Sequence, residues 1–152
     1  MSTFTASELT SAVRNIHAGL QAKSSRLDVA VTGTASSVVY LAKVPHGATI
    51  VDFIFFVDDG GADDTWKLGL QLPHAEAGGS NTFTVTESAL MTETASTAGP
   101  TLRPIGGKLP YRVSISDNVN QRWAWIQAVN TVAISASAAF RFTVVYQMDE
   151  ST

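Results

Sequence analysis

The chain of 152 residues contains no cysteine. Disulfide bonds, thiolate zinc sites and cysteine nucleophiles are therefore excluded, so stability must come from the core and from assembly. No apolar run approaches the roughly 20 residues that a membrane-spanning helix needs. The opening sequence, MSTFTASELTSAVRN, also lacks the basic-then-apolar order of a secretory signal. We expect a soluble protein that is made in a cytoplasm and has no membrane partner.

Charge is scarce as well. Charged residues make up 15% of the chain, against roughly 25% in an average globular protein. The formal net charge is -3, and the ten Lys and Arg residues are scattered singly. Because proteins that bind phosphate backbones normally carry a basic stripe, we expect no nucleic-acid partner.

Patterns that carry catalysis or cofactor binding are missing too. The sequence has no G-x-S-x-G nucleophile motif, no P-loop and no dinucleotide-binding glycine pattern. His17, His46 and His74 lie far apart, each without a second ligand at metal-binding spacing. Four aspartates between positions 58 and 64 flank Gly60-Gly61 but do not meet the calcium-loop pattern, and solvated turn residues explain them. We predict no enzyme activity, no cofactor and no metal.

The most informative segment that is present runs from Val38 to Asp58. Two dense β-type runs meet there at a Val-Pro-His-Gly-Ala corner, where Pro45 fixes its own φ and Gly47 can adopt a positive φ. The second run is apolar on both faces, so the sheet that contains it must be covered on both sides. Strict alternation predicts these two faces: Ile50, Ile54 and Phe56 on one, and Val51, Phe53, Phe55 and Val57 on the other.

Further strands follow at regular intervals, separated by frequent turn signals. They are expected at residues 65–72, 81–86, 111–116, 122–129, 132–135 and 138–148. About eight or nine strands of this kind predict an all-β protein, an antiparallel β-sandwich of jelly-roll or immunoglobulin-like type. We expect residues 27–152 to form this single domain.

Residues 1–26 differ from the remainder and have two interpretations. Leu9, Val13, Ile16 and Leu20 fall at helical spacing, and Thr5 to Glu8 has the form of a capping box, which favours a short N-terminal helix. One helix with a single apolar stripe needs something to lie on, which favours an arm that orders on a neighbouring subunit. The sequence leaves both alternatives open.

A family resemblance rests on the central segment. The order "strand, V-P-x-G-A-x-I-V-D, aromatic-rich strand, V-D-D, short loop, strand ending L-G-L" resembles small structural proteins of tailed-bacteriophage virions, most of all head decoration or cement proteins. The matching residues are Leu41 to Asp59 and Trp66 to Leu70, with Phe140 to Tyr146 similar to the closing strand of such chains. Together they cover about half of the chain.

The resemblance implies a non-enzymatic protein that binds the assembled head and stabilises the shell by bridging capsomers. Its partners would be the major capsid protein and itself, as a homotrimer on the capsid surface after synthesis in the host cytoplasm. The candidate residues for subunit or capsid contact are Phe4, Leu9, Val13 and Ile16.

Two other roles stay open. One is a tail structural component. The other is a receptor- or glycan-binding module of a phage fibre. Trp123 and Trp125 lie two residues apart on one face of a strand, and exposed aromatic pairs of this kind bind sugars, although they also occur in cores and at interfaces.

Overall fold

The computed structural model describes residues 3–8, 14–17, 19–28, 37–58, 65–75, 81–95, 101–102, 108–116, 119–130 and 139–148. All regular elements within these ranges are strands, which confirms the all-β prediction. The described residues include no helix long and apolar enough to cross a membrane. The strands are β1 (Thr3–Thr5), β2 (Ser7–Glu8), β3 (Arg14–His17), β4 (Leu20–Asp28), β5 (Val38–Pro45), β6 (Ala48–Asp58), β7 (Thr65–Ala75), β8 (Asn81–Ala95), β9 (Thr101–Leu102), β10 (Tyr111–Arg112), β11 (Trp123–Asn130) and β12 (Ala139–Met148).

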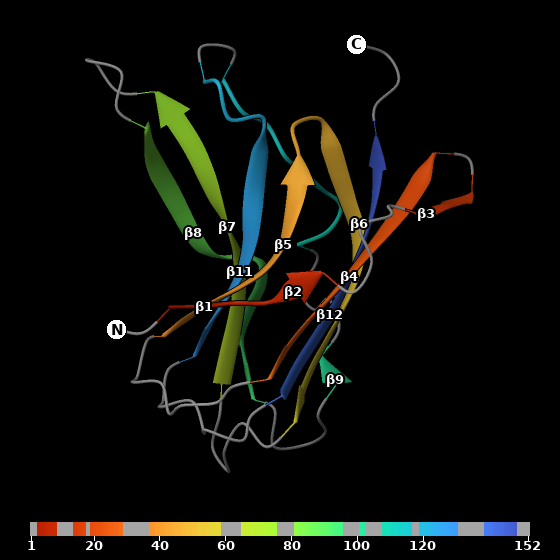
Figure 1. The fold of residues 1–152 in the computed structure, drawn as a ribbon, viewed down its shortest axis with the longest axis vertical. Helices are drawn as coiled ribbons and strands as arrows, with labels where there is room; N and C mark the ends of the chain where they lie inside the picture. Colours follow the sequence, from red (N-terminus) through yellow and green to blue (C-terminus); the bar gives the residue numbers. More distant parts are fainter. Residues whose placement is uncertain are drawn as a thin grey trace.

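The strands form two sheets that pack face to face (Figure 1). The five-stranded sheet has the order β1-β5-β11-β7-β8. The seven-stranded sheet has the order β10-β6-β12-β4-β2, with β3 also pairing with β4 and β9 with β6. Among the described strands, β1 and β5 pair in parallel and all other pairs are antiparallel. The predicted β-sandwich is confirmed.

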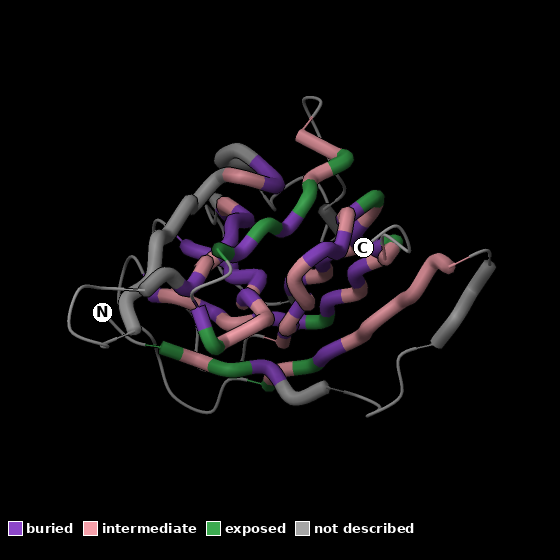
Figure 2. The backbone as a smooth tube through the Cα atoms, turned by 90° about the horizontal axis from the view of Figure 1, so that it is seen from above, coloured by how far each residue is buried: buried purple, intermediate pink, exposed green. Residues whose placement is uncertain are grey.

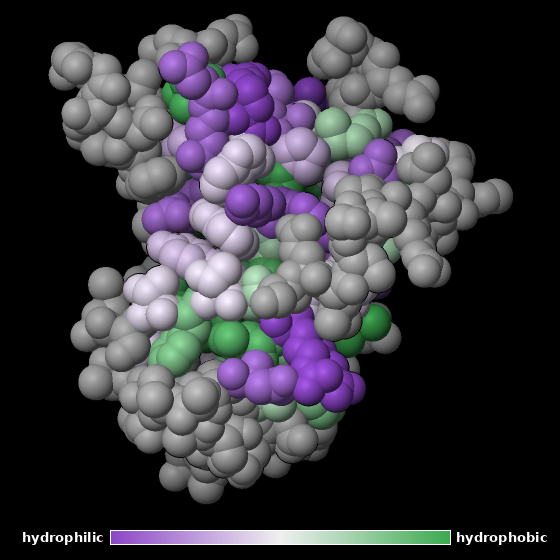
Figure 3. All heavy atoms as spheres, in the orientation of Figure 1, coloured by the Kyte–Doolittle hydropathy of each residue, from purple (hydrophilic) through white to green (hydrophobic). Residues whose placement is uncertain are grey.

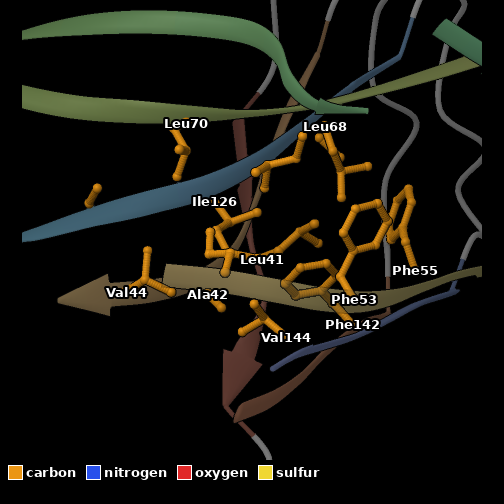
Figure 4. Close-up of a cluster of buried hydrophobic side chains, with 14 of the residues drawn as sticks. Leu41, Ala42, Val44, Phe53, Phe55, Leu68, Leu70, Ile126, Phe142 and Val144 are labelled. Carbon is orange, nitrogen blue, oxygen red and sulfur yellow. The ribbon is translucent and has the colours of Figure 1, made fainter. Parts of the chain in front are cut away.

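The core lies between the two sheets and is built by residues that alternate along each strand. In β12, Phe140, Phe142, Val144 and Tyr146 are buried, whereas the residues between them are half-buried or exposed. Figure 2 shows buried residues alternating with less buried ones along several stretches of the chain. Leu68, Leu70 and Ile126 of the five-stranded sheet face the buried side chains of β6 and β12 (Figure 4). Period-two patterning therefore places most of the core correctly.

Strand β6 departs from strict alternation at its beginning. Both Ile50 and Phe53 are fully buried, whereas Val51 is 36% exposed. The pairing of β6 with β12 shifts at this point, because Tyr146 pairs with Ile50 and Val145 with Asp52, which leaves Val51 as the extra residue of a β-bulge. The predicted faces are therefore wrong for Ile50 and Val51.

The first segment forms strands in its described part, so the helix alternative is wrong there. β1 pairs with β5 at the edge of one sheet, and β2 pairs with β4 at the edge of the other. Ala6, buried between these two short strands, donates its N–H to the carbonyl of Tyr40 at 2.7 Å. A single helix without a partner surface is marginal, whereas pairing gives the segment and the two sheet edges hydrogen-bond partners for their backbone groups.

The hairpin of β3 and β4 projects from the body of the sandwich (Figure 1). Gly19 adopts a positive φ of 85° in the turn, which glycine accommodates without strain. Residues 20–24 of β4 are half-buried, with less cover than the middle strands of the sheets. The hairpin therefore carries part of the chain away from the core.

The corner between β5 and β6 is fixed by the loop of residues 113–116. Gly47, with a φ of 86°, donates its N–H to the carbonyl of Val113 at 2.9 Å. The imidazole Nδ1 of His46 accepts a hydrogen bond from the N–H of Ile115 at 2.9 Å. Since Ile115 is only 3% exposed, His46 supplies the acceptor that this buried donor needs.

We therefore expect His46→Ala to lower the free energy of unfolding by about 1–3 kcal/mol, because it leaves a buried N–H without an acceptor. His46→Asn is the matched control, since its amide oxygen takes the place of Nδ1 and recovers most of the loss. Urea denaturation measures both variants. Equal losses for Ala and Asn would show that the hydrogen bond does not stabilise the corner.

Candidate ligand-binding and assembly surfaces

The outer face of the seven-stranded sheet is largely apolar where β6 and β12 lie side by side. Val51 is exposed there, and Ile54, Phe56 and Val145 are half-buried. The guanidinium carbon of Arg141 lies 5.9 Å from the centre of the Phe56 ring. The described chain does not cover this apolar face fully, so the second cover expected for β6 stays a prediction.

Hydroxyl groups continue this outer face toward β4. The side-chain oxygens of Ser24 and Thr143 lie 2.9 Å apart and share a hydrogen bond. Beyond them Arg26 forms an exposed ion pair with Asp28, which contributes little to stability. The surface from β6 to β4 thus changes from apolar to polar, as the rim of a protein contact does.

Asp52, which belongs to the bulge of β6, has a local role. Its Oδ1 accepts a hydrogen bond from the N–H of Phe53 at 2.8 Å. A carboxylate that bonds its neighbouring backbone N–H supports an irregular strand conformation. Asp52 therefore stabilises the bulge that turns Val51 outward.

A second candidate surface lies on the outer face of the five-stranded sheet. The rings of Tyr40 and Trp125 stack with centroids 5.3 Å apart, and Trp123 meets Trp125 edge to face at 5.7 Å. The ammonium nitrogen of Lys43 lies 4.3 Å from the centroid of the Trp123 ring and 5.1 Å from that of Trp125. We call these four residues the aromatic-lysine site.

Strand register builds this site. Lys43 is the direct cross-strand partner of Trp125, and Pro45 is the partner of Trp123. Gln71 pairs with Trp125 on its other side and donates its side-chain N–H to the Tyr40 hydroxyl at 3.2 Å. The sequence pointed to both tryptophans but not to Lys43, because a cross-strand partner is fixed by pairing and not by spacing along the chain.

A cleft of about 480 Å³ opens next to the aromatic-lysine site. It lies at the edge of the sandwich, where β4 of one sheet comes close to β5 of the other. The Lys23 ammonium donates to the carbonyl of Lys43 at 3.1 Å and so bridges the sheets. Figure 3 shows weakly polar residues over the middle of one face of the molecule and hydrophobic residues mainly in the lower half.

The structure describes two of the four residues predicted to contact a partner, Phe4 and Ile16. Phe4 lies in β1 and packs, half-buried, against the core. Ile16 belongs to β3 of the projecting hairpin, and Leu9 and Val13 lie outside the described residues. Phe4 and Ile16 therefore belong to different parts of the N-terminal segment, one on the sandwich and one on the hairpin.

The residues weighed as metal ligands give no site in the described part of the chain. No group of three or more His, Asp or Glu residues is close enough there to hold an ion. His46 is engaged by Ile115. The aspartate cluster lies outside the described residues, apart from the backbone of Asp58 at the end of β6.

Comparison with known proteins gives a clear result at the level of structure. No family model and no curated protein matches the sequence. A chain from the capsid of Ralstonia phage GP4 superposes with a TM-score of 0.67 at 15% identity, covering 99% of this chain and 100% of that chain. A chain from the capsid asymmetric unit of cyanophage Pam1 gives 0.59 at 13% identity, covering 93% of each.

A third likeness comes from the acid-stable capsid structure of Helicobacter pylori bacteriophage KHP30. One of its chains gives a TM-score of 0.55 at 11% identity, covering 88% of this chain and 90% of that chain. All three likenesses run over nearly the whole chain, so they describe the complete sandwich and not one shared hairpin. The expected resemblance to structural proteins of phage virions is confirmed, and this chain has the β-sandwich fold of chains found in phage capsids.

Proposed function

We propose that this protein is a non-enzymatic structural component of a phage virion, a decoration or cement protein that binds the assembled head and bridges capsomers. The observation that supports it best is the likeness to capsid chains along almost the entire sandwich. Its partners in this proposal are the major capsid protein and further copies of itself. Its place is the outer surface of the capsid, after synthesis in the host cytoplasm.

The surfaces of the chain are suited to such a role. The apolar outer face around Ile54 and Phe56 offers buried area to a neighbour, and its low charge keeps the cost of desolvation small. The projecting hairpin of β3 and β4 can extend toward a neighbouring subunit. Together they support contact with two neighbours at once, which bridging requires.

Stabilisation of the shell follows from mass action. A subunit that binds only the assembled shell lowers its free energy, by about 2.7 kcal/mol per site when the free concentration is 100 times Kd. A trimer multiplies weak contacts into avidity. A three-fold junction of a symmetric shell matches such a trimer, which is why we propose that state.

The N-terminal segment, for which the sequence named Phe4, Leu9, Val13 and Ile16, remains our candidate for contact with the capsid or a neighbouring subunit, and Ile16 on the hairpin is the residue that we test. The hairpin that carries Ile16 extends away from the core (Figure 1). We expect this part to bind a neighbour, while the part around Phe4 anchors the segment on its own sandwich.

The test combines light scattering of the purified protein with sedimentation on empty shells of the parent phage. We expect a stable trimer that saturates the shells at a fixed ratio. Ile16→Asp should weaken shell binding at least about tenfold, because a charge buried in a contact costs more than 1.4 kcal/mol. Thermal unfolding of the free variant checks that it is folded.

Thr3→Asp is the matched control for that variant. It places the same charge in the same segment, but at an exposed position of β1 on the sandwich. We expect it to bind shells as the unchanged protein does. A monomer that does not sediment with shells would contradict the proposed function, and equal binding by both variants would remove the hairpin from the contact.

A further inference from the structure

The cleft next to the aromatic-lysine site has a composition that the assembly role does not explain. It is formed by four strands from both sheets, at the edge where β4 and β5 face each other. The side chains that define it are Lys23 of β4, Lys43 and Pro45 of β5, Trp123 of β11, and Tyr146 and Met148 of β12. Its volume of about 480 Å³ falls within the range of about 300–1,000 Å³ typical of small-molecule sites.

The charge of this cleft is opposite to that of the chain. The protein has a formal net charge of -3, yet two lysines and no acidic residue line the cleft. The described part of the chain gives Lys43 contacts with two indole rings and no carboxylate partner. An ammonium group beside an apolar cleft attracts an anionic group more strongly than it would in open water.

The aromatic rings restrict what the rest of the ligand can be. Trp123 lines the cleft and stands at 89° to Trp125, so the two indoles form a corner with the Lys43 ammonium near both of them. Indole rings pack against flat bodies with an apolar face and polar edges. A pyranose ring has such a face in its C–H groups, and the Gln21 amide in the cleft wall can bond its hydroxyls.

Other anionic ligands fit less well. An Asp or Glu side chain of a peptide would satisfy Lys43 but would leave the indole corner unfilled. Single-stranded nucleic acid would stack on the rings but needs a groove of cations that follows its backbone, and this chain carries its basic residues singly. A sugar with a carboxylate on its ring satisfies both the lysine and the indole.

We infer that this cleft binds an acidic saccharide, with the carboxylate at Lys43 and the sugar ring against Trp123. The inference does not depend on the proposed role in the capsid. Lys23 lines the same cleft and is held there by its hydrogen bond to the Lys43 carbonyl. Trp125 packs edge to face against Trp123, and Tyr40 stacks on Trp125. These contacts hold the two indole rings in their orientation.

The test begins with a glycan array that contains uronate, sialate and neutral sugars, probed with the full-length protein. We expect acidic glycans to bind above neutral ones. Calorimetry with oligogalacturonate then measures affinity, and its methyl ester, which keeps the ring and loses the charge, should bind at least about tenfold more weakly. An array without preference for acidic sugars would overturn the inference.

Variants locate the site. Lys43→Gln and Trp123→Ala should each weaken the binding of oligogalacturonate by at least about tenfold. Arg141→Gln is the matched control, because Arg141 also lies over an aromatic ring, that of Phe56, but on the other sheet and beside no lysine. Unchanged binding in all three variants would place the sugar elsewhere and overturn the assignment.

Two further ligands separate the sugar from the alternatives. Oligoglutamate and oligothymidylate carry negative charge but have no pyranose ring. We expect neither to compete with oligogalacturonate. Competition by either at equal concentration would show that the cleft selects charge alone, which contradicts the inference. Lys43 and Trp123 are only half-buried, so we expect both variants to fold. Thermal unfolding checks this for each variant.

Discussion

Replacing Phe55 with alanine is expected to lower the free energy of unfolding by about 3–5 kcal/mol. Phe55 is fully buried, and its ring contacts those of Trp66, Phe140 and Phe142 with centroids 5.5, 6.2 and 6.3 Å apart. Figure 4 shows Phe55 beside Phe53 and Phe142 in the core. Removing it leaves a cavity between both sheets and also removes edge-to-face contacts, which add to the loss of buried area. Urea denaturation at a fixed protein concentration measures the change.

Phe56→Ala provides the matched control one residue further along the same strand. Phe56 points to the outer face, is half-buried and lies under Arg141, so we expect a loss of about 1 kcal/mol. If the apolar outer face contacts a neighbour, as proposed, Phe56→Ala should also weaken that contact, because Phe56 belongs to this face. Equal losses in the free protein would contradict the assignment of the two faces of β6.

The second large effect concerns Ile50 and Val51. Because the bulge turns Ile50 inward and Val51 outward, Ile50→Ala is expected to cost about 2–5 kcal/mol. Val51→Ala is expected to change stability by less than about 0.5 kcal/mol, as surface substitutions usually do. Strict alternation from Phe53 would place Val51 inside and predicts the reverse order, so the pair separates the two registers in one denaturation experiment.

The sequence predicted the sandwich because the period-two patterns of its strands match the alternation of buried and less buried residues in the structure. In β12 every second residue from Phe140 to Tyr146 is buried, as expected. The Pro45 to Gly47 corner was also predicted correctly, since proline and glycine act locally on the backbone. Local patterns of this kind need no knowledge of a partner strand.

The bulge in β6 could not be predicted in this way. A bulge is a relation between two strands, here β6 and β12, which lie far apart in the sequence. Asp52 was visible inside the apolar run, and its bond to the N–H of Phe53 now gives its presence a local reason. A polar residue inside an apolar strand is therefore the signal that marks this irregularity.

The N-terminal segment was the least predictable part for a related reason. Its helical spacing and capping box are local signals that favour a helix. In the folded chain the described part of the segment instead forms strands that pair with β5 and β4. Whether a sheet has open edges depends on the whole fold and not on the segment itself. The same holds for Lys43, which reaches the two tryptophans only through the register of β5 with β11.

The inferred saccharide site borders one of the two proposed assembly surfaces. Gln21 and Lys23 of β4, the second strand of the hairpin, line the cleft together with Trp123 of the five-stranded sheet. A hairpin contact made through β3 would leave these cleft residues open to a ligand. Many copies on one capsid would raise the avidity for a polysaccharide well above the affinity of a single site.

The most direct test of the account is electron cryomicroscopy of empty shells saturated with the purified protein. We predict density for the sandwich on the outer surface, arranged as trimers at three-fold positions, with the β3–β4 hairpin directed at a neighbouring subunit. Shells that remain bare, or density for the protein in the tail instead of on the head, would contradict the central claim.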